Sequence, residues 1–410
     1  VGTQSPGMLE QDECASPVSP GRAKVAGFFP ARLRQRLPMR DAQELLLPKK
    51  KRSKFKPAMM QTRSLDPQHM IGDMQASVAV FKAVVGPGIL FLPSGVKSAG
   101  LASALFLTAV VGFISAWCML LLLESARELR ARGIKVSSLG DLGFAAFGQA
   151  GKVAVETAVV MAQLGFCTAY CVFIAENLQA AIYEAYDGFP APPGSGEPCS
   201  LPPSLSGERL VYFIILFTIL PLTPLTWIRH LKYFATSNII ASLLVMSTLL
   251  YMLIAFVCAL AERGPASEIR VFNLGGSLVY FGTAMYAFEG IGVLLPVERS
   301  MTTPDRCPYV VCSTMTVVTL AQMVFASSAY LLFGGSTASI ITTSLTRGGV
   351  IGGEKAAVAV QLAWCVVVLL TFPLQLFPAA RVLESSLLPD TRSGKKWTKN
   401  GFCRLGVGFL

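Results

Sequence analysis

Charged residues are scarce in this 410-residue chain, because Asp, Glu, Lys and Arg together make up only 14% of the sequence. Ordinary soluble domains carry roughly 25%, so the composition excludes a soluble enzyme. Hydrophobic residues instead reach 53%, and they gather in runs of about 20, the length that a helix needs to cross ~30 Å of hydrocarbon. The sequence therefore predicts an all-α polytopic membrane protein.

Side chains that bind metals or perform catalysis are also few. The chain has only two histidines, His69 and His230, both outside the apolar runs, and its ten cysteines include no CxxC pair. Metal sites need nitrogen and sulfur ligands at close spacing. We therefore expect no metal, no cofactor and no enzymatic activity.

The apolar runs predict eight membrane-spanning helices. They cover residues 75–97, 101–123, 151–182, 210–228, 233–260, 275–296, 308–333 and 355–380. Basic residues gather in alternate loops, as at Arg127–Lys135 and Arg299–Arg306. Since cytosolic loops carry an excess of Lys and Arg, this alternation places the N-terminus in the cytosol. The chain has no Asn-X-Ser/Thr sequon, so glycosylation offers no second indication of sidedness.

Residues 1–70 differ from the rest of the chain in charge and pattern. They carry +7 of the formal net charge of +11 and show no apolar periodicity. We expect a disordered basic cytosolic tail there and a transmembrane domain over residues 71–410. The run Lys49–Lys54 favours contact with anionic cytosolic lipid, or a solvated topology marker, over a nuclear import signal. No nucleic-acid partner is expected.

Two predicted spans contain glycine-rich interruptions. The first span holds Val85, Gly86, Pro87, Gly88 and Ile89, and the sixth holds a near copy, Glu289-Gly290-Ile291-Gly292. A proline between two glycines frees backbone groups that lipid cannot satisfy, so such a break lines a cavity, unless it is only a kink that lets helices pack closely. Broken helices at corresponding places in two halves are typical of inverted-repeat transporters. Their freed amides and carbonyls fit an amino acid zwitterion.

Several side chains near these breaks are candidates for binding and coupling. Glu289 is either a proton carrier or only a hydrogen-bond acceptor for the unwound backbone of the first span. Tyr170, Tyr286 and Phe288 either form an aromatic wall of a substrate pocket or serve as ordinary packing. The hydroxyl of Thr371 is a candidate ligand for a sodium ion. Snorkelling or a local ion pair accounts for the other charged residues of the spans, Lys82, Glu176 and Glu298.

Five separate stretches of the chain form motifs that can be compared with those of known proteins. They are Gly86–Leu90 with Pro93 and Lys97–Gly100; Gln163–Cys167 with Tyr170, Val172–Ala175 and Asn177; Pro224–Arg229; Phe281–Gly292; and Thr371–Gln375. Together and in this order they resemble the amino acid/auxin permease family, specifically its branch of proton-coupled and vacuolar neutral amino acid transporters. The resemblance implies a LeuT-like inverted-repeat fold of eleven spans with a cytosolic N-terminus. It also implies secondary active transport driven by protons or, in some branches, by sodium.

The resemblance also assigns roles to residues and shows two departures. Gly86–Ile89 and Tyr286–Gly290 match the unwound segments that contact substrate, and Glu289 matches the acidic residue of the family. Pro87, however, stands where relatives usually carry a small polar residue, which removes a hydroxyl and an amide from the site. The chain also ends at Leu410, within the approach to a ninth span, so about eight of the eleven spans are expected and the second repeat is incomplete.

These observations lead to a functional prediction. We expect a transporter of neutral L-amino acids, coupled to H⁺, in a vacuolar or lysosomal membrane or in the plasma membrane. Sodium-coupled symport and an amino acid sensor with little flux are the alternatives. The residues expected to contact the substrate are Val85, Gly86, Pro87, Gly88, Ile89, Tyr170, Tyr286, Ala287, Phe288 and Gly290.

Overall fold

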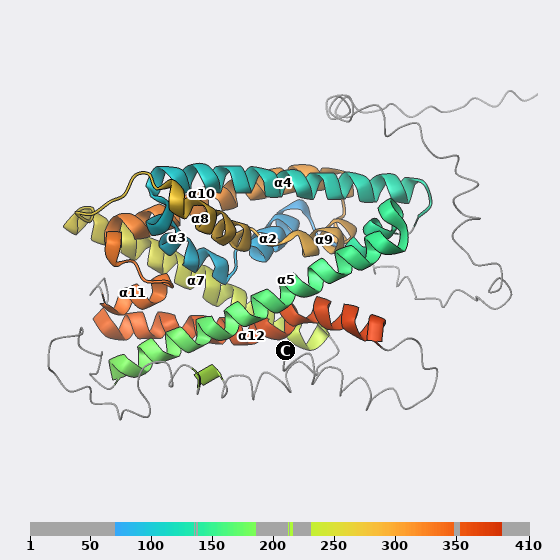
Figure 1. Cartoon of the computed structure of the whole chain (residues 1–410). Helices are drawn as coiled ribbons and strands as arrows, with labels where there is room; N and C mark the ends of the chain where they lie inside the picture. The colour runs from blue at the N-terminus through green and yellow to red at the C-terminus, as the bar shows by residue number, and fades with distance from the viewer. Residues whose placement is uncertain are drawn as a thin grey trace, which may run out of the picture. The chain divides into compact units, whose positions relative to one another are not determined.

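The computed structural model describes residues 70–134, 136, 138–185, 212, 214–215, 231–347 and 353–387, and all of them lie in the compact unit Leu65–Leu410. The elements are α2 (Asp73–Val84), η6 (Pro87–Phe91), α3 (Leu92–Ala99), α4 (Leu101–Ala131), α5 (Leu139–Ala185), α7 (Leu231–Arg263), α8 (Leu274–Ala287), η8 (Ile291–Val293), α9 (Leu294–Ser300), η9 (Pro304–Arg306), α10 (Cys307–Phe333), η10 (Gly334–Ser336), α11 (Ile341–Arg347) and α12 (Gly353–Leu387). Within these ranges the fold is helical, as predicted (Figure 1).

Most of the predicted spans are present. Six helical segments are long and apolar enough to cross a membrane, and α2 with η6–α3, bent by 46°, makes one further broken span. These segments match seven of the eight predicted positions. The remaining span, 210–228, and the basic tail lie almost wholly outside the described residues. The prediction missed the short helix α11 and the start of α5, which turns at Gly148, where φ is 66°.

The helices can be divided into two groups by the partners on which they pack. In one group, α3 packs on α4, α8 and α10, and α2 packs on α9 and α10. In the other, α5 packs along α12 and α11, and α7 lies against both α10 and α12. Figure 1 shows α2 beside α9 and α3 beside α8, with α5 crossing over α12. The two interrupted spans are therefore neighbours.

Arginine side chains gather at one end of the bundle, at the ends of α4 and α9 and in η9. We call the end that holds Arg127, Arg130, Arg299 and Arg306 the basic end, and the other the opposite end. At the basic end the chain before α2 joins the chain after α9, because the amide of Ile71 donates to a carbonyl in the last turn of α9 at 2.8 Å. The ends of α4 and α9 and the starts of α2 and α10 therefore lie together.

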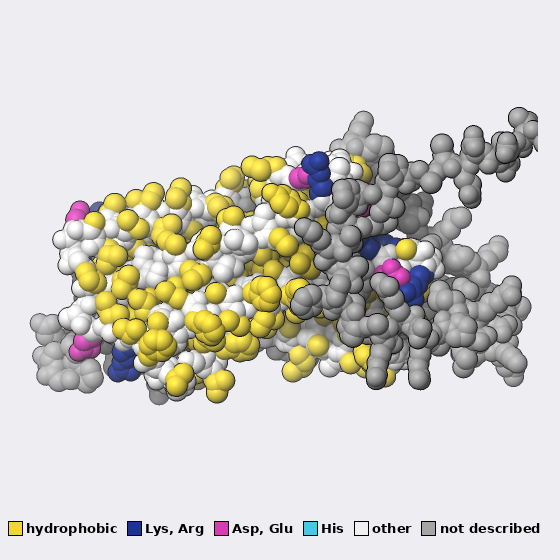
Figure 2. All heavy atoms as spheres, turned by 90° about the horizontal axis from the view of Figure 1, so that it is seen from above, with side chains coloured by type: hydrophobic (Ala, Val, Ile, Leu, Met, Phe, Trp, Pro, Cys, Tyr) yellow, Lys and Arg dark blue, Asp and Glu magenta, His cyan; other side chains and the backbone are white. Residues whose placement is uncertain are grey.

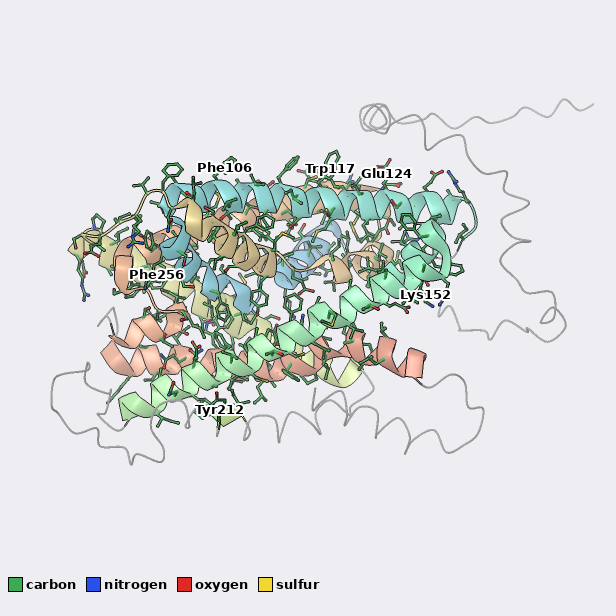
Figure 3. The ribbon with its side chains drawn as sticks, viewed as in Figure 1. Phe106, Trp117, Glu124, Lys152, Tyr212 and Phe256 are labelled. Atoms are coloured by element: carbon green, nitrogen blue, oxygen red, sulfur yellow. The ribbon has the colours of Figure 1, made fainter. Side chains whose placement is uncertain are left out.

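The outer surface fits a lipid environment. Hydrophobic side chains cover the long face of the described structure, and charged side chains gather toward its ends (Figure 2). Phe106 and Trp117 point outward from α4 (Figure 3), with exposed fractions of 69% and 41%. Exposed apolar area of this extent is expected only where lipid replaces water. The chain is a multi-pass membrane protein.

One buried hydrogen bond joins the start of α4 to α8. The hydroxyl of Tyr280 lies 2.6 Å from the hydroxyl of Thr108, which in turn donates to the Ala104 carbonyl at 2.8 Å. Tyr280 and Thr108 are both almost fully buried. The Tyr280 hydroxyl is therefore the donor that satisfies Thr108.

We expect Tyr280→Phe to lower the free energy of unfolding by about 1 kcal/mol, the usual net contribution of one buried hydrogen bond. Thermal unfolding in detergent micelles measures this change. Tyr309→Phe is the matched control, since Tyr309 is 75% exposed on α10 and its hydroxyl loss should leave the transition unchanged. Equal melting temperatures for Tyr280→Phe and the wild type would contradict the assignment.

Candidate functional site

The first break separates α2 from α3. Val85, with φ −84° and ψ 90°, and Gly86, with φ −118° and ψ −164°, are extended rather than helical. Pro87 then opens the 3₁₀ turn η6. Proline is tolerated at a first helical position because the amide that it lacks has no intrahelical partner there. The predicted interruption of the first span is confirmed.

The second break separates α8 from α9. After Ala287 the helix stops, and Glu289 and Gly290 are not helical. Among the described residues, the amides of Glu289 and Gly290 donate no backbone hydrogen bond. The carbonyl of Ala287 accepts one from the side-chain amide of Gln322 in α10, at 3.1 Å. Gln322 is fully buried, and its contact with the break was not predicted from the sequence.

The two breaks touch through their backbones. A Cβ atom on Gly88 would lie 2.8 Å from the Cα of Ala287 and 3.2 Å from Cδ1 of Tyr286. A Cβ atom on Gly290 would lie 2.6 Å from Cγ2 and 3.4 Å from the Cα of Val84. Only glycine allows such close approach of two chains. The glycines of the two motifs therefore bring segments distant in sequence into direct contact.

Glu289 faces the second group of helices across this contact. Its Oε1 accepts a hydrogen bond from Gln163 of α5 and its Oε2 one from Gln375 of α12, each at 3.4 Å. One sequence-based expectation was that Glu289 accepts hydrogen bonds from the unwound backbone of the first span. In the structure its hydrogen-bond donors are instead two side-chain amides. None of the ion pairs among the described residues involves Glu289. The side-chain oxygen of Gln163 itself, Oε1, is buried without a hydrogen-bond partner.

Aromatic rings form a continuous layer between the breaks and the opposite end. The Tyr286 ring lies 5.2 Å from Phe166 and 5.9 Å from Phe91, measured between ring centroids. Phe91 lies 6.1 Å from Phe173, which lies 6.4 Å from Trp364. These residues come from α8, η6, α5 and α12, so both groups of helices contribute to the layer.

The remaining predicted side chains separate into two sets. Tyr170 is buried with its ring 6.4 Å from Phe372, and its hydroxyl lies beside that of Thr371. The Thr371 hydroxyl donates back to carbonyls of its own helix at 2.9 and 3.2 Å. Phe288, by contrast, turns toward α4, where its Cε1 would lie 3.3 Å from a Cβ on Gly112. The structure thus brings Tyr170 and Thr371 to the α5–α12 side and places the Phe288 ring in the packing behind the break.

Helix α11 covers the opposite end of this region. Its Thr342 hydroxyl lies 2.5 Å from Oδ1 of Asn177, and its Thr342 carbonyl accepts a hydrogen bond from Gln361 at 3.1 Å. All three residues are fully buried. On the other side of the bundle, Lys97 at the end of α3 donates to the carbonyl of Thr337 at 3.0 Å. The segment before α12 therefore joins the two groups of helices, which the sequence did not predict.

A family model described as "Transmembrane amino acid transporter protein" matches residues 69–408. The chain belongs to this family. The match includes both breaks, α5 and α12, and it agrees with the resemblance that the sequence motifs predicted.

Named relatives of the family cover most of this chain. Vacuolar amino acid transporter 3 of Schizosaccharomyces pombe is 27% identical over 331 residues, which are 80% of this chain and 46% of that protein. Vacuolar amino acid transporter 3 of Saccharomyces cerevisiae is 28% identical over 82% of this chain and 45% of its own length. Amino acid transporter AVT3C of Arabidopsis thaliana is 30% identical over 74% and 68%, respectively. The chain thus spans about half the length of the yeast relatives.

A solved structure supports the fold. The crystal structure of MhsT in complex with L-phenylalanine superimposes with a TM-score of 0.50 and 15% sequence identity, over 83% of this chain and 78% of that chain. This similarity confirms the predicted LeuT-like transporter fold for this family member.

Proposed function

We propose that this protein moves neutral L-amino acids across a membrane by secondary active transport coupled to protons. The observation that carries the proposal is the contact between the two breaks, with the half-buried Glu289 carboxylate at its edge. The printed names of the yeast and plant relatives, which are amino acid transporters, support the substrate class.

The substrate occupies the two breaks in this proposal. Its carboxylate binds amides freed at the break of α8, and its ammonium group binds carbonyls freed there. Val85–Ile89 form one wall and Tyr286–Gly290 the other, with Tyr170 closing the α5 side. Phe288 supports this wall from behind, through its packing against α4. The aromatic layer limits access from the opposite end.

Glu289 carries the coupled proton in this proposal. A carboxylate deep in a bilayer is costly when ionised, and the two glutamine amides that contact it supply no positive charge. Protonation of Glu289 removes that cost. The bound proton and the bound substrate therefore stabilise the same state of the transporter, the one that carries both. Sodium coupling through the Thr371 oxygen is the alternative, because a hydroxyl that donates to its own helix keeps acceptor lone pairs that can bind a cation.

In this proposal, access to the site alternates between the two sides of the membrane because one group of helices rocks against the other. Among the described residues near the site, the polar contacts between the groups include Glu289 with Gln163 and Gln375, and Lys97 with Thr337. These hydrogen bonds must break for one group to rock against the other. By the distribution of basic residues we assign the basic end to the cytosol, and by the relatives' names we assign the protein to a vacuolar type of membrane, with the plasma membrane as the alternative.

Uptake into proteoliposomes tests this proposal. We expect radiolabelled neutral amino acid to cross the vesicle membrane when a pH gradient is imposed, and replacement of sodium by N-methylglucamine to leave the rate unchanged. Equilibrium binding is measured on the same preparation. Sodium-dependent uptake would replace the proton assignment, and binding without any flux would identify a sensor instead of a transporter.

A further inference from the structure

A charge cluster around the buried carboxylate of Glu298 links the second broken span to α4 at the basic end. The Glu298 side chain of α9 is 2% exposed, and its Oε1 accepts a hydrogen bond from Nε of Arg127 at 2.8 Å. Its Oε2 accepts one from Nη1 of Arg130, also at 2.8 Å. Arg127 additionally donates to the carbonyl of Pro304 in η9. The sequence predicts snorkelling or a local ion pair for Glu298, and the structure shows the ion pair.

This cluster is more specific than the apolar contacts around it. Leu295 of α9 also packs with Ala126 and Val136 in a small core at the same place. Apolar contacts tolerate sliding, whereas a carboxylate that engages two guanidinium groups separately accepts few geometries. A buried ion pair of this kind fixes orientation more than it adds stability.

Helix α9 needs such a fixed orientation. It has seven residues, Leu294–Ser300, and it is separated from α8 by the break. The end of α9 is also linked to the segment just before α2, because the Ile71 amide donates to the Ser300 carbonyl and the amide of Thr302, just after α9, donates to the Ile71 carbonyl. The cytosolic halves of both broken spans are therefore joined to each other, and Glu298 joins them to α4.

We infer that Glu298 is a positioning residue that makes α9, and α2 with it, move together with α4 during transport. The inference rests on the proposed transport function. Glu298 does not contact the breaks, which lie on the other side of η8. Its loss should therefore slow the conformational step and leave the binding of the amino acid unchanged.

The decisive variant is Glu298→Gln, which keeps the shape of the side chain and removes its charge. Uptake of radiolabelled neutral amino acid and equilibrium binding are measured per folded molecule in proteoliposomes. We expect the maximal rate to fall about tenfold while the Kd stays within about twofold of wild type, as for a slowed conformational step. A maximal rate equal to that of wild type would overturn the inference. So would a Kd that rises in parallel with the loss of rate.

Two further variants complete the design. Arg127→Gln removes one partner of Glu298 from a side chain that is 31% exposed, so it serves if Glu298→Gln does not fold, with the same split between rate and Kd expected. Glu128→Gln is the matched control at the same end of α4, because Glu128 pairs with Arg132 on the exposed surface and such pairs contribute little. Absence of transport by the wild type would refute the proposed function itself, whereas normal transport by wild type and Glu298→Gln alike would refute only this inference.

Discussion

Replacing Gly88 by valine is expected to lower the rate of amino acid uptake by at least about 100-fold, the loss that accompanies misplacement of a site by roughly 1 Å. The new Cβ would meet the Cα of Ala287 at 2.8 Å and the Tyr286 ring at 3.2 Å. Backbone atoms cannot turn aside as side chains do, so the two breaks must separate. Initial uptake rates and substrate Kd, both per folded molecule, measure the effect.

Gly282→Val is the matched control for this substitution. Gly282 lies in α8 on the exposed surface, and a Cβ there would meet nothing within 4 Å. We expect its uptake rate and Kd to equal those of wild type. Wild-type affinity in Gly88→Val would contradict the assignment of the substrate to the paired breaks.

Glu289→Gln is expected to abolish uptake driven by a pH gradient. Glutamine has the size of glutamate and can still form hydrogen bonds with Gln163 and Gln375, but it cannot carry a proton. Exchange of labelled for unlabelled amino acid needs no net proton movement, so it should continue at a reduced rate. Uptake at a series of external pH values, alongside exchange at equal pH on both sides, separates the two activities.

The control for this experiment is Glu124→Gln. Glu124 lies on the exposed surface of α4, outside the site (Figure 3), and its neutralisation should leave the pH dependence of uptake as in wild type. If Glu289→Gln retains the pH dependence of wild type, Glu289 has no part in proton coupling and another group must be sought.

The breaks were predictable because their signal is local. Gly86-Pro87-Gly88 and Glu289-Gly290 interrupt apolar runs that otherwise continue for the length of a span, and lipid tolerates such interruptions only where protein or water satisfies the backbone. Their similarity to each other also predicted that they pair. The contact between Gly88 and Ala287 confirms this part of the prediction.

The partners of the breaks were not predictable in the same way. Gln163, Gln375 and Gln322 are visible in the sequence as single amides within apolar runs, but the group that each one contacts lies on another helix. The sequence suggested backbone of the first span as the partner of Glu289. Which side-chain amides reach it depends on how α5 and α12 pack, and no local pattern encodes that.

Two further features could not be predicted from the sequence, namely the direction of the Phe288 ring and the short helix α11. Phe288 adjoins the break in sequence, yet the end of α8 turns its ring toward Gly112 of α4. Helix α11 has only seven residues, too few for a span, so its cover over the opposite end was not predicted. Both features follow from tertiary packing that a hydropathy pattern does not contain.

The proposed substrate site is tested most directly by a cryo-electron microscopy structure of the protein in lipid nanodiscs with a saturating neutral amino acid. We expect ligand density that contacts both Gly86–Ile89 and Tyr286–Gly290, with the two breaks still interrupted. Ligand density elsewhere, or two continuous helices through these segments, would contradict it.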